Sequence, residues 1–142
     1  MTAPVAERRW AAYVWALPTT AVGVLLAGVG LATGARASIV GGVLEAHGGV
    51  LDPMLRRLVP LRGGASAMTL GHVVVARDAG CLERTRRHER VHVRQTERWG
   101  PLFIPAYVVA SVAAAARGRH YYRDNPFERE AVQACAADVA SR

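Results

Sequence analysis

Residues 10 to 35 form a stretch of 26 residues without one charged side chain, bounded by Arg9 and Arg36. About 20 apolar residues are enough to cross the hydrocarbon core of a bilayer. Three aromatic residues lie within the first six positions, where such side chains gather at a membrane interface. The stretch predicts that residues 1 to 36 form an N-terminal transmembrane anchor.

A cleaved signal peptide is the alternative explanation of this stretch. Arg8 and Arg9 would be its basic start, and Ala35-Arg36-Ala37 would be a weak cleavage site. The apolar region of a signal peptide usually has about 7–15 residues. The uncharged stretch is longer than that, which favours a retained anchor.

The composition fits one domain attached to a membrane. The chain has 142 residues, of which 51% are hydrophobic and 20% charged. All 18 basic residues are arginine, a bias typical of a GC-rich genome. The net charge of +7 makes anionic lipid or nucleic acid a suitable partner. Cys81 and Cys135 stand alone and indicate no disulfide framework.

After the anchor, the sequence predicts a mainly α protein with a small β-sheet, an α+β domain over residues 37–142. Paired glycines break β-branched runs into short strands, and Asp78 is a suitable N-cap for a long helix. The predicted elements are strands at about 37–77 and helices at about 79–99, 101–117 and 126–140.

His88, Glu89 and His92 form an H-E-x-x-H pattern within the helix at 79–99. Residues four positions apart share a helix face, so both imidazoles can bind one ion. A zinc ion lowers the pKa of a bound water, and the adjacent carboxylate can take its proton as general base. The pattern predicts Zn²⁺ on His88 and His92, with Glu89 catalytic.

A solvated helix face that carries incidental histidines is the simpler explanation, because six arginines surround the motif. However, Val91 and Val93 are the only sizeable apolar residues between Glu83 and Glu97. That is too little for the usual apolar stripe that holds a helix to a core. Something polar is therefore expected to be buried along this helix.

Catalytic zinc usually has three protein ligands, and the candidates for the third are Glu128 and Glu130. Here the chain resembles the gluzincin metallopeptidases, in which H-E-x-x-H is completed by a glutamate in a downstream E-x-x-A helix. The resemblance implies a zincin-like helix pair, with Glu128 of Glu128-Arg129-Glu130-Ala131 as ligand. The Asp that usually follows in that family is replaced by Val132, which leaves one supporting contact unfilled.

The likeness extends to the longer form H-E-x-x-H-x-x-Q of small bacterial zincin-like families, with Gln95 in the last position. The chain also looks similar to short bacterial membrane proteins that carry HERVHVRQ, GPLF and NPFEREA, over about residues 70 to 134. These resemblances imply a bacterial inner (cytoplasmic) membrane protein, with a lipid bilayer and a peptide or protein substrate as partners.

A second uncharged stretch, residues 99–116, separates the histidines from Glu128. A simple crossing of the bilayer by this stretch would place Glu128 roughly 25 Å away at 1.5 Å per residue. The zinc hypothesis therefore predicts that the stretch does not make such a crossing.

The sequence gives weaker indications that other polar residues belong to a catalytic site. Hydrolysis needs a donor to the developing oxyanion, and the candidates are His120, Tyr121 and Tyr122, shortly before Glu128. His47 and His72 fit ordinary strand or turn histidines. The strand bearing His72 is also a candidate edge for pairing with an extended peptide.

Three functions are consistent with these features. The first is a membrane-anchored zinc peptidase, and the second is a non-catalytic, zinc-stabilised membrane module for signalling or scaffolding. The third is a basic nucleic-acid-binding protein that uses the arginines between Arg84 and Arg98. The third accounts for neither the apolar stretch nor the histidine spacing, so nucleic acid is not an expected partner.

Overall fold

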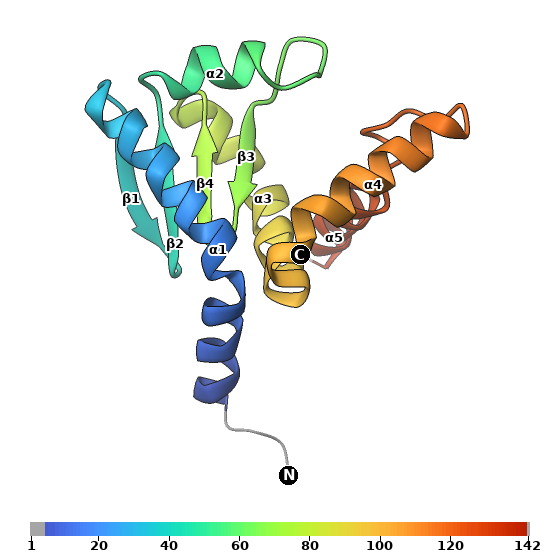
Figure 1. Ribbon diagram of the computed structural model, residues 1–142, viewed down its shortest axis with the longest axis horizontal. Coiled ribbons are helices and arrows are strands. Elements are labelled where there is room, and N and C mark those ends of the chain that lie inside the picture. The colour runs from blue at the N-terminus through green and yellow to red at the C-terminus, as the bar shows by residue number, and fades with distance from the viewer. Residues whose placement is uncertain (1–4, 142) are drawn as a thin grey trace.

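The computed structural model describes residues 5–141 as a mainly helical chain with a small mixed four-stranded sheet (Figure 1). The predicted α+β class is confirmed. In chain order the elements are α1 (Val5–Ala32), β1 (Arg36–Val40), β2 (Val43–His47), α2 (Leu51–Arg57), β3 (Ala67–Leu70), β4 (Val73–Ala76), α3 (Ala79–Trp99), the 3-10 turn η1 (Gly100–Leu102), α4 (Phe103–Ala116) and α5 (Pro126–Ala140).

The sheet has the strand order β1-β2-β4-β3, with a parallel pair at its centre and an antiparallel hairpin on each side. The β1–β2 hairpin turns at Gly41-Gly42, where both residues have positive φ. Two consecutive positive φ angles define the type I′ turn that matches the twist of paired strands, and glycine adopts them at least cost. β3 is an edge strand beside α3.

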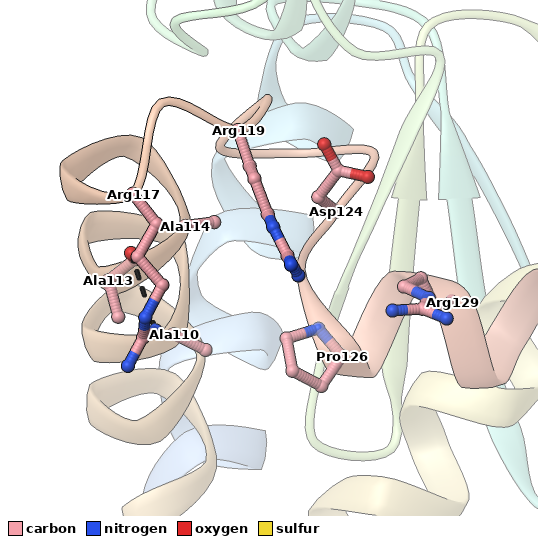
Figure 2. A pocket seen from close by; sticks show the side chains of 8 residues that line it. All are labelled: Ala110, Ala113, Ala114, Arg117, Arg119, Asp124, Pro126 and Arg129. Atoms are coloured by element: carbon pink, nitrogen blue, oxygen red, sulfur yellow. Dashed lines mark hydrogen bonds between the residues drawn. The ribbon is translucent and has the colours of Figure 1, made fainter.

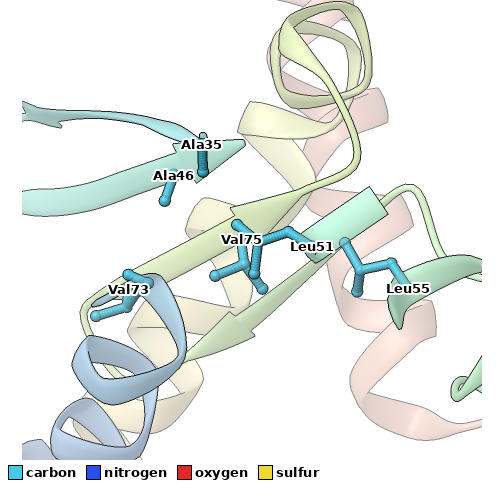
Figure 3. Close-up of a cluster of buried hydrophobic side chains, with 7 residues drawn as sticks. Ala35, Ala46, Leu51, Leu55, Val73 and Val75 are labelled. Carbon is cyan, nitrogen blue, oxygen red and sulfur yellow. The ribbon is translucent and has the colours of Figure 1, made fainter. Parts of the chain in front are cut away.

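Helices cover both faces of the sheet, so β4 is buried along its whole length. Successive side chains of a strand point to opposite faces. Val73 and Val75 pack with residues of α1 and α2 in one buried cluster (Figure 3), whereas Val74 packs with Leu82 and Val93 of α3 in another. The sheet thereby places α3 on one face and α1 on the other.

α1 packs on the sheet through a stripe of small residues at helical spacing, which includes Ala16, Gly23 and Ala27. A Cβ atom at Gly23 would lie 2.7 Å from the carbonyl oxygen of Leu70, so only glycine permits this close approach. Ala27 belongs to the same buried cluster as Leu51. The division at residue 36 into anchor and domain stays a prediction, and α1 also forms one wall of the core.

The remaining faces of α1 are apolar and exposed. Its exposed large side chains include Trp10, Val14, Leu17, Leu25 and Val29. Within the described residues, two helical segments, Arg9–Ala32 and Ala79–Ala116, are long and apolar enough to cross a membrane by length and composition alone. The second segment combines α3, η1 and α4.

α3 is held to the sheet by polar contacts as well as by apolar ones. Asp78 caps its first turn by accepting a hydrogen bond of 2.7 Å from the Cys81 amide. Glu45 of β2, only 1% exposed, accepts hydrogen bonds from Arg86 and Arg90. No feature of the sequence indicated a role for Glu45, yet in the structure its carboxylate neutralises part of the arginine-rich side of α3.

Glu45→Gln is expected to destabilise the fold by roughly 2–3 kcal/mol, since breaking a buried ion pair leaves uncompensated charge. This destabilisation is smaller than that usually caused by breaking a buried ion pair, because the Arg86 and Arg90 side chains are 32% and 21% exposed and can be hydrated when Glu45 is removed. Glu83→Gln is the matched control, since it removes a 73% exposed carboxylate from the same Arg86. It should cost less than about 1 kcal/mol. Urea unfolding measures both, and equal losses would exclude a special role for Glu45.

The chain turns back after α3 and brings α5 against it (Figure 1). α4 has 14 residues, which span roughly 21 Å at 1.5 Å per residue and fall short of a hydrocarbon core of about 30 Å. Asn125 caps α5 and donates hydrogen bonds to the Tyr107 carbonyl and the Ser111 hydroxyl of α4. These bonds fix the start of α5 beside α4, so the second apolar stretch does not separate Glu128 from the histidines of α3.

Candidate metal centre

Three side chains with metal-binding atoms converge between α3 and α5. His88 and His92 lie one turn apart on α3, and their Nε2 atoms are 3.0 Å apart. Glu128, in the first turn of α5, has Oε2 2.9 Å from Nε2 of His88 and Oε1 3.2 Å from Nε2 of His92. These three residues, which we call the metal trio, could hold a metal ion.

The geometry of the trio fits a zinc-sized ion. With zinc–ligand bonds of about 2.0–2.1 Å, two ligand atoms of a tetrahedral site lie roughly 3.3 Å apart. The observed separations are close to this value. Glu128 is 4% exposed, and its Oε2 is buried without a hydrogen-bond partner among the described residues, although Nε2 of His88 lies at ion-pair distance. A cation would compensate this buried oxygen.

Gln95 sets the orientation of the His92 ring. Its amide nitrogen donates to the Phe127 carbonyl at 3.0 Å and to Glu130 at 2.9 Å. The amide oxygen therefore faces Nδ1 of His92, at 2.8 Å. Because an amide oxygen only accepts, Nδ1 carries the hydrogen and Nε2 of the neutral ring is left as a lone pair directed at the trio.

Gln95→Met is expected to lower metal affinity about 10- to 100-fold, as is usual when a residue that orients a ligand is lost. Methionine fills a similar volume but accepts no strong hydrogen bond from His92. Gln133→Met, on the exposed side of α5, is the matched control and should leave the affinity unchanged. Zinc titration against a chromophoric chelator measures both. Equal affinities of Gln95→Met and the parent protein would show that ring orientation does not limit binding.

A residue of α4 holds the Glu128 side chain in place. The Tyr107 hydroxyl donates to Oε1 of Glu128 at 2.7 Å, so one carboxylate oxygen is held while the other faces His88. Burial by itself would raise the pKa of Glu128, but its close contacts with the His88 and His92 rings and with the Tyr107 hydroxyl outweigh burial and hold that pKa far below its usual range. Tyr107 was not among the residues predicted from the sequence. The feature that could have indicated it is a phenol hydroxyl in a helix whose other side chains, apart from Ser111, are apolar.

Glu89 lies beside the trio on the buried side of α3. It is 5% exposed, and the Thr69 hydroxyl of β3 donates to its Oε2 at 2.7 Å. Burial raises the pKa of Glu89, although the nearby charges of His92 and His88 act in the opposite direction. A carboxylate with a raised pKa is suited to accept and release a proton. The predicted burial of polar groups along α3 is confirmed, since Glu89, His92, Gln95 and Thr96 are all buried.

The structure separates the two candidate glutamates. Glu128 joins the histidines, whereas Glu130 accepts hydrogen bonds from Gln95 and from Arg98, the latter at 2.7 Å. Val132, at the position where the gluzincin resemblance implies an Asp, is 60% exposed. No hydrogen bond to Nδ1 of His88 is found in the described part of the chain.

The three candidate oxyanion donors lie in different places. His120 stabilises its own turn by accepting from the Tyr122 and Arg123 amides, and the Tyr121 hydroxyl donates to the Pro60 carbonyl. Burial and the nearby charge of Glu128 raise the pKa of Tyr122. Of the three, Tyr122 is therefore the one close to the trio.

The remaining two histidines lie outside the trio. His47 ends β2, and His72 lies in the turn between β3 and β4. The edge of the sheet is β3, the strand that precedes His72 and carries Thr69.

Comparisons with known proteins add no assignment to this site. Neither a family model, nor a curated protein, nor a solved structure is significantly similar to the chain.

Proposed function

We propose that this chain is a membrane-attached, zinc-dependent peptidase of the gluzincin type. One observation carries the proposal: His88, His92 and Glu128 direct three ligand atoms at one point, with the buried carboxylate of Glu89 beside them. Two histidines and a glutamate are the ligands of several zinc peptidases. A structural zinc site would not need the fourth group, Glu89.

Each residue then has a distinct role. When bound, zinc acts as a Lewis acid that lowers the pKa of water and polarises a carbonyl. Glu89 accepts a proton from the attacking water and later delivers it to the leaving amine. Thr69 keeps the Glu89 carboxylate in place, and Gln95 fixes the ring of His92. Tyr122 is the candidate donor to the developing oxyanion.

Attachment to a membrane is proposed through α1. The faces of α1 turned away from the sheet expose large apolar side chains, whereas the face on the sheet carries small ones. Cleavage near Ala37 would remove a helix that packs against Leu51 and Leu70, so a retained α1 fits better than a signal peptide. The intact mass of the membrane-extracted protein should therefore include α1.

The non-catalytic module remains the second candidate. It is favoured by Val132, because the group that usually supports a ligand in this family is missing. A nucleic-acid-binding function has less support, since Arg86, Arg87, Arg90 and Arg98 of α3 already form ion pairs within the chain.

Metal analysis of the purified protein tests the proposal. We expect one zinc per chain, removed by a strong chelator and restored by added zinc. Hydrolysis of a peptide library should follow the zinc content. A protein without zinc would overturn the proposal. Zinc without hydrolysis, at full occupancy, would favour the non-catalytic module.

A further inference from the structure

A cavity of about 230 Å³ lies at the end of the sheet that carries both hairpin turns. It is lined by α1, the β1–β2 and β3–β4 turns, and α3, and no residue of the metal trio lines it. In Figure 1 these elements meet at the lower end of the sheet, where the N-terminal half of α1 extends beyond it. We call it the basic cavity, after Arg9, Arg90 and Arg94 in its lining.

The charges of the basic cavity are unbalanced. Three guanidinium groups face one carboxylate, that of Glu97. Arg90 is partly neutralised, because it donates to Glu45 and to the Val40 carbonyl, each at 2.7 Å. Arg9 and Arg94 form no hydrogen bond or ion pair within residues 9–141, although the charge of Arg94 also acts on Glu130 of α5. Two guanidinium groups are thus available for an anion, and guanidinium matches phosphate especially well.

His72 supplies a second, independent indication of a ligand. It lines the cavity, is 5% exposed, and stacks on the Tyr13 ring at a centroid distance of 4.1 Å. Its Nε2 lies 2.9 Å from the Glu97 carboxylate, which only accepts, so Nε2 carries the hydrogen. Nδ1 of the neutral ring is then a buried acceptor, and it has no partner in the described chain. A ligand hydroxyl would satisfy it.

The position of the cavity on α1 indicates where such a ligand comes from. Arg9 directly precedes the uncharged stretch, and the next residue, Trp10, is 71% exposed. Basic and aromatic residues at the end of an apolar helix lie at the level of lipid headgroups. If α1 attaches the chain to a membrane, a phosphate bound at Arg9 would belong to a phospholipid.

We propose that the basic cavity binds the headgroup of an acidic phospholipid that carries both a phosphodiester and a hydroxyl, as phosphatidylglycerol does. Arg9 and Arg94 bind the phosphate, and Nδ1 of His72 accepts from the headgroup hydroxyl. The lipid source depends on the proposed membrane attachment of α1. The site itself is independent of the metal trio.

The test uses the full chain in an uncharged detergent, so that membrane insertion does not enter the measurement. Calorimetric titration with short-chain phosphatidylglycerol should show one saturable site. Short-chain phosphatidylcholine, glycerol 3-phosphate and inorganic phosphate should each bind at least about tenfold more weakly, because each lacks a hydroxyl, an acyl chain or both. The double variant Arg9→Gln/Arg94→Gln should bind phosphatidylglycerol at least about tenfold more weakly than the parent, since it loses two charge-assisted contacts.

The matched control is Arg117→Gln/Arg119→Gln, which removes the same charge from a different cavity, between the end of α4 and the start of α5 (Figure 2). Its affinity should stay within about twofold of the parent, since distant exposed charges are screened by salt. Equal binding by Arg9→Gln/Arg94→Gln and the parent would overturn the proposal. Inorganic phosphate binding as tightly as the lipid would overturn the lipid as the source.

Three further measurements distinguish failure of the headgroup site from failure of the proposed function. Circular dichroism checks that both double variants are folded. Zinc content, measured on the same samples, tests the metal trio separately, and extraction of the chain without detergent tests membrane attachment. A zinc-containing, detergent-requiring protein that does not bind phosphatidylglycerol would refute the headgroup site alone.

Discussion

Substitution of His88 by alanine is expected to lower zinc affinity by roughly 10²–10⁴-fold, since structural zinc sites bind with about 10–16 kcal/mol and the variant loses one of three ligands. Nε2 of His88 lies 2.9 Å and 3.0 Å from the other two ligand atoms. The partly exposed position of His88 allows truncation with little loss of packing. Zinc per chain after dialysis, and chelator competition, measure the change.

His47→Ala is the matched control, because it removes a half-buried histidine from β2, away from the trio. It should retain one zinc per chain. The zinc-dependent rise in melting temperature, which follows from ligand binding to the folded state, should also disappear only in His88→Ala. Full zinc content in His88→Ala would contradict the assignment of this ligand.

Glu89→Gln is expected to lower the rate of peptide hydrolysis by about 10²–10⁴-fold, the usual contribution of a general base, while zinc content stays at one per chain. Glutamine keeps the shape of the side chain and can still accept a hydrogen bond from Thr69, as Oε2 of Glu89 does at 2.7 Å in the parent protein. It cannot take a proton from water. The turnover rate at saturating peptide, together with metal analysis of the same sample, measures both effects.

Glu83→Gln, in the same helix but 73% exposed, is the control for this variant and should keep the parent rate. A Glu89→Gln protein with parent activity and full zinc content would remove Glu89 from the mechanism. Loss of zinc in the same variant would instead indicate that Glu89 supports metal binding.

The local elements of this fold are readable from the sequence. The helix predicted at 79–99 is observed as Ala79–Trp99, and the one predicted at 126–140 as Pro126–Ala140. Both begin at a polar N-cap, Asp78 or Asn125, that satisfies a backbone amide of the first turn. Capping and turn chemistry act between neighbours in the chain, so such boundaries follow from local residues.

Contacts between residues far apart in the chain could not be predicted from the sequence in this way. Glu45 is one acidic residue in a short strand, and only the packing of β2 under α3 places it against Arg86 and Arg90. Tyr107 appeared as part of an apolar stretch, and its hydroxyl reaches Glu128 only because α4 and α5 run beside each other. These contacts join residues 21 to 45 positions apart, for which one sequence has no local signal.

The role of α1 also depends on the assembled fold. Its uncharged composition predicted an anchor, and its length and apolar character are consistent with a membrane helix. The sequence did not indicate that its small residues would pack on the sheet. Gly23 and Ala27 allow α1 to pack closely against Leu70 and Leu51. Such close packing depends on both surfaces, so the sequence of α1 does not predict it.

Local signals in the sequence were enough to predict the α+β class, the helix that carries His88, Glu89 and His92, and two candidates for a third ligand. Only the folded chain separates Glu128 from Glu130, since it directs the first at the histidines and the second at Gln95 and Arg98. The two kinds of feature differ in the distance along the chain over which they form. Residues four apart on a helix share a face through local geometry, whereas a ligand on another helix is placed only by the path of α4 and the capped start of α5.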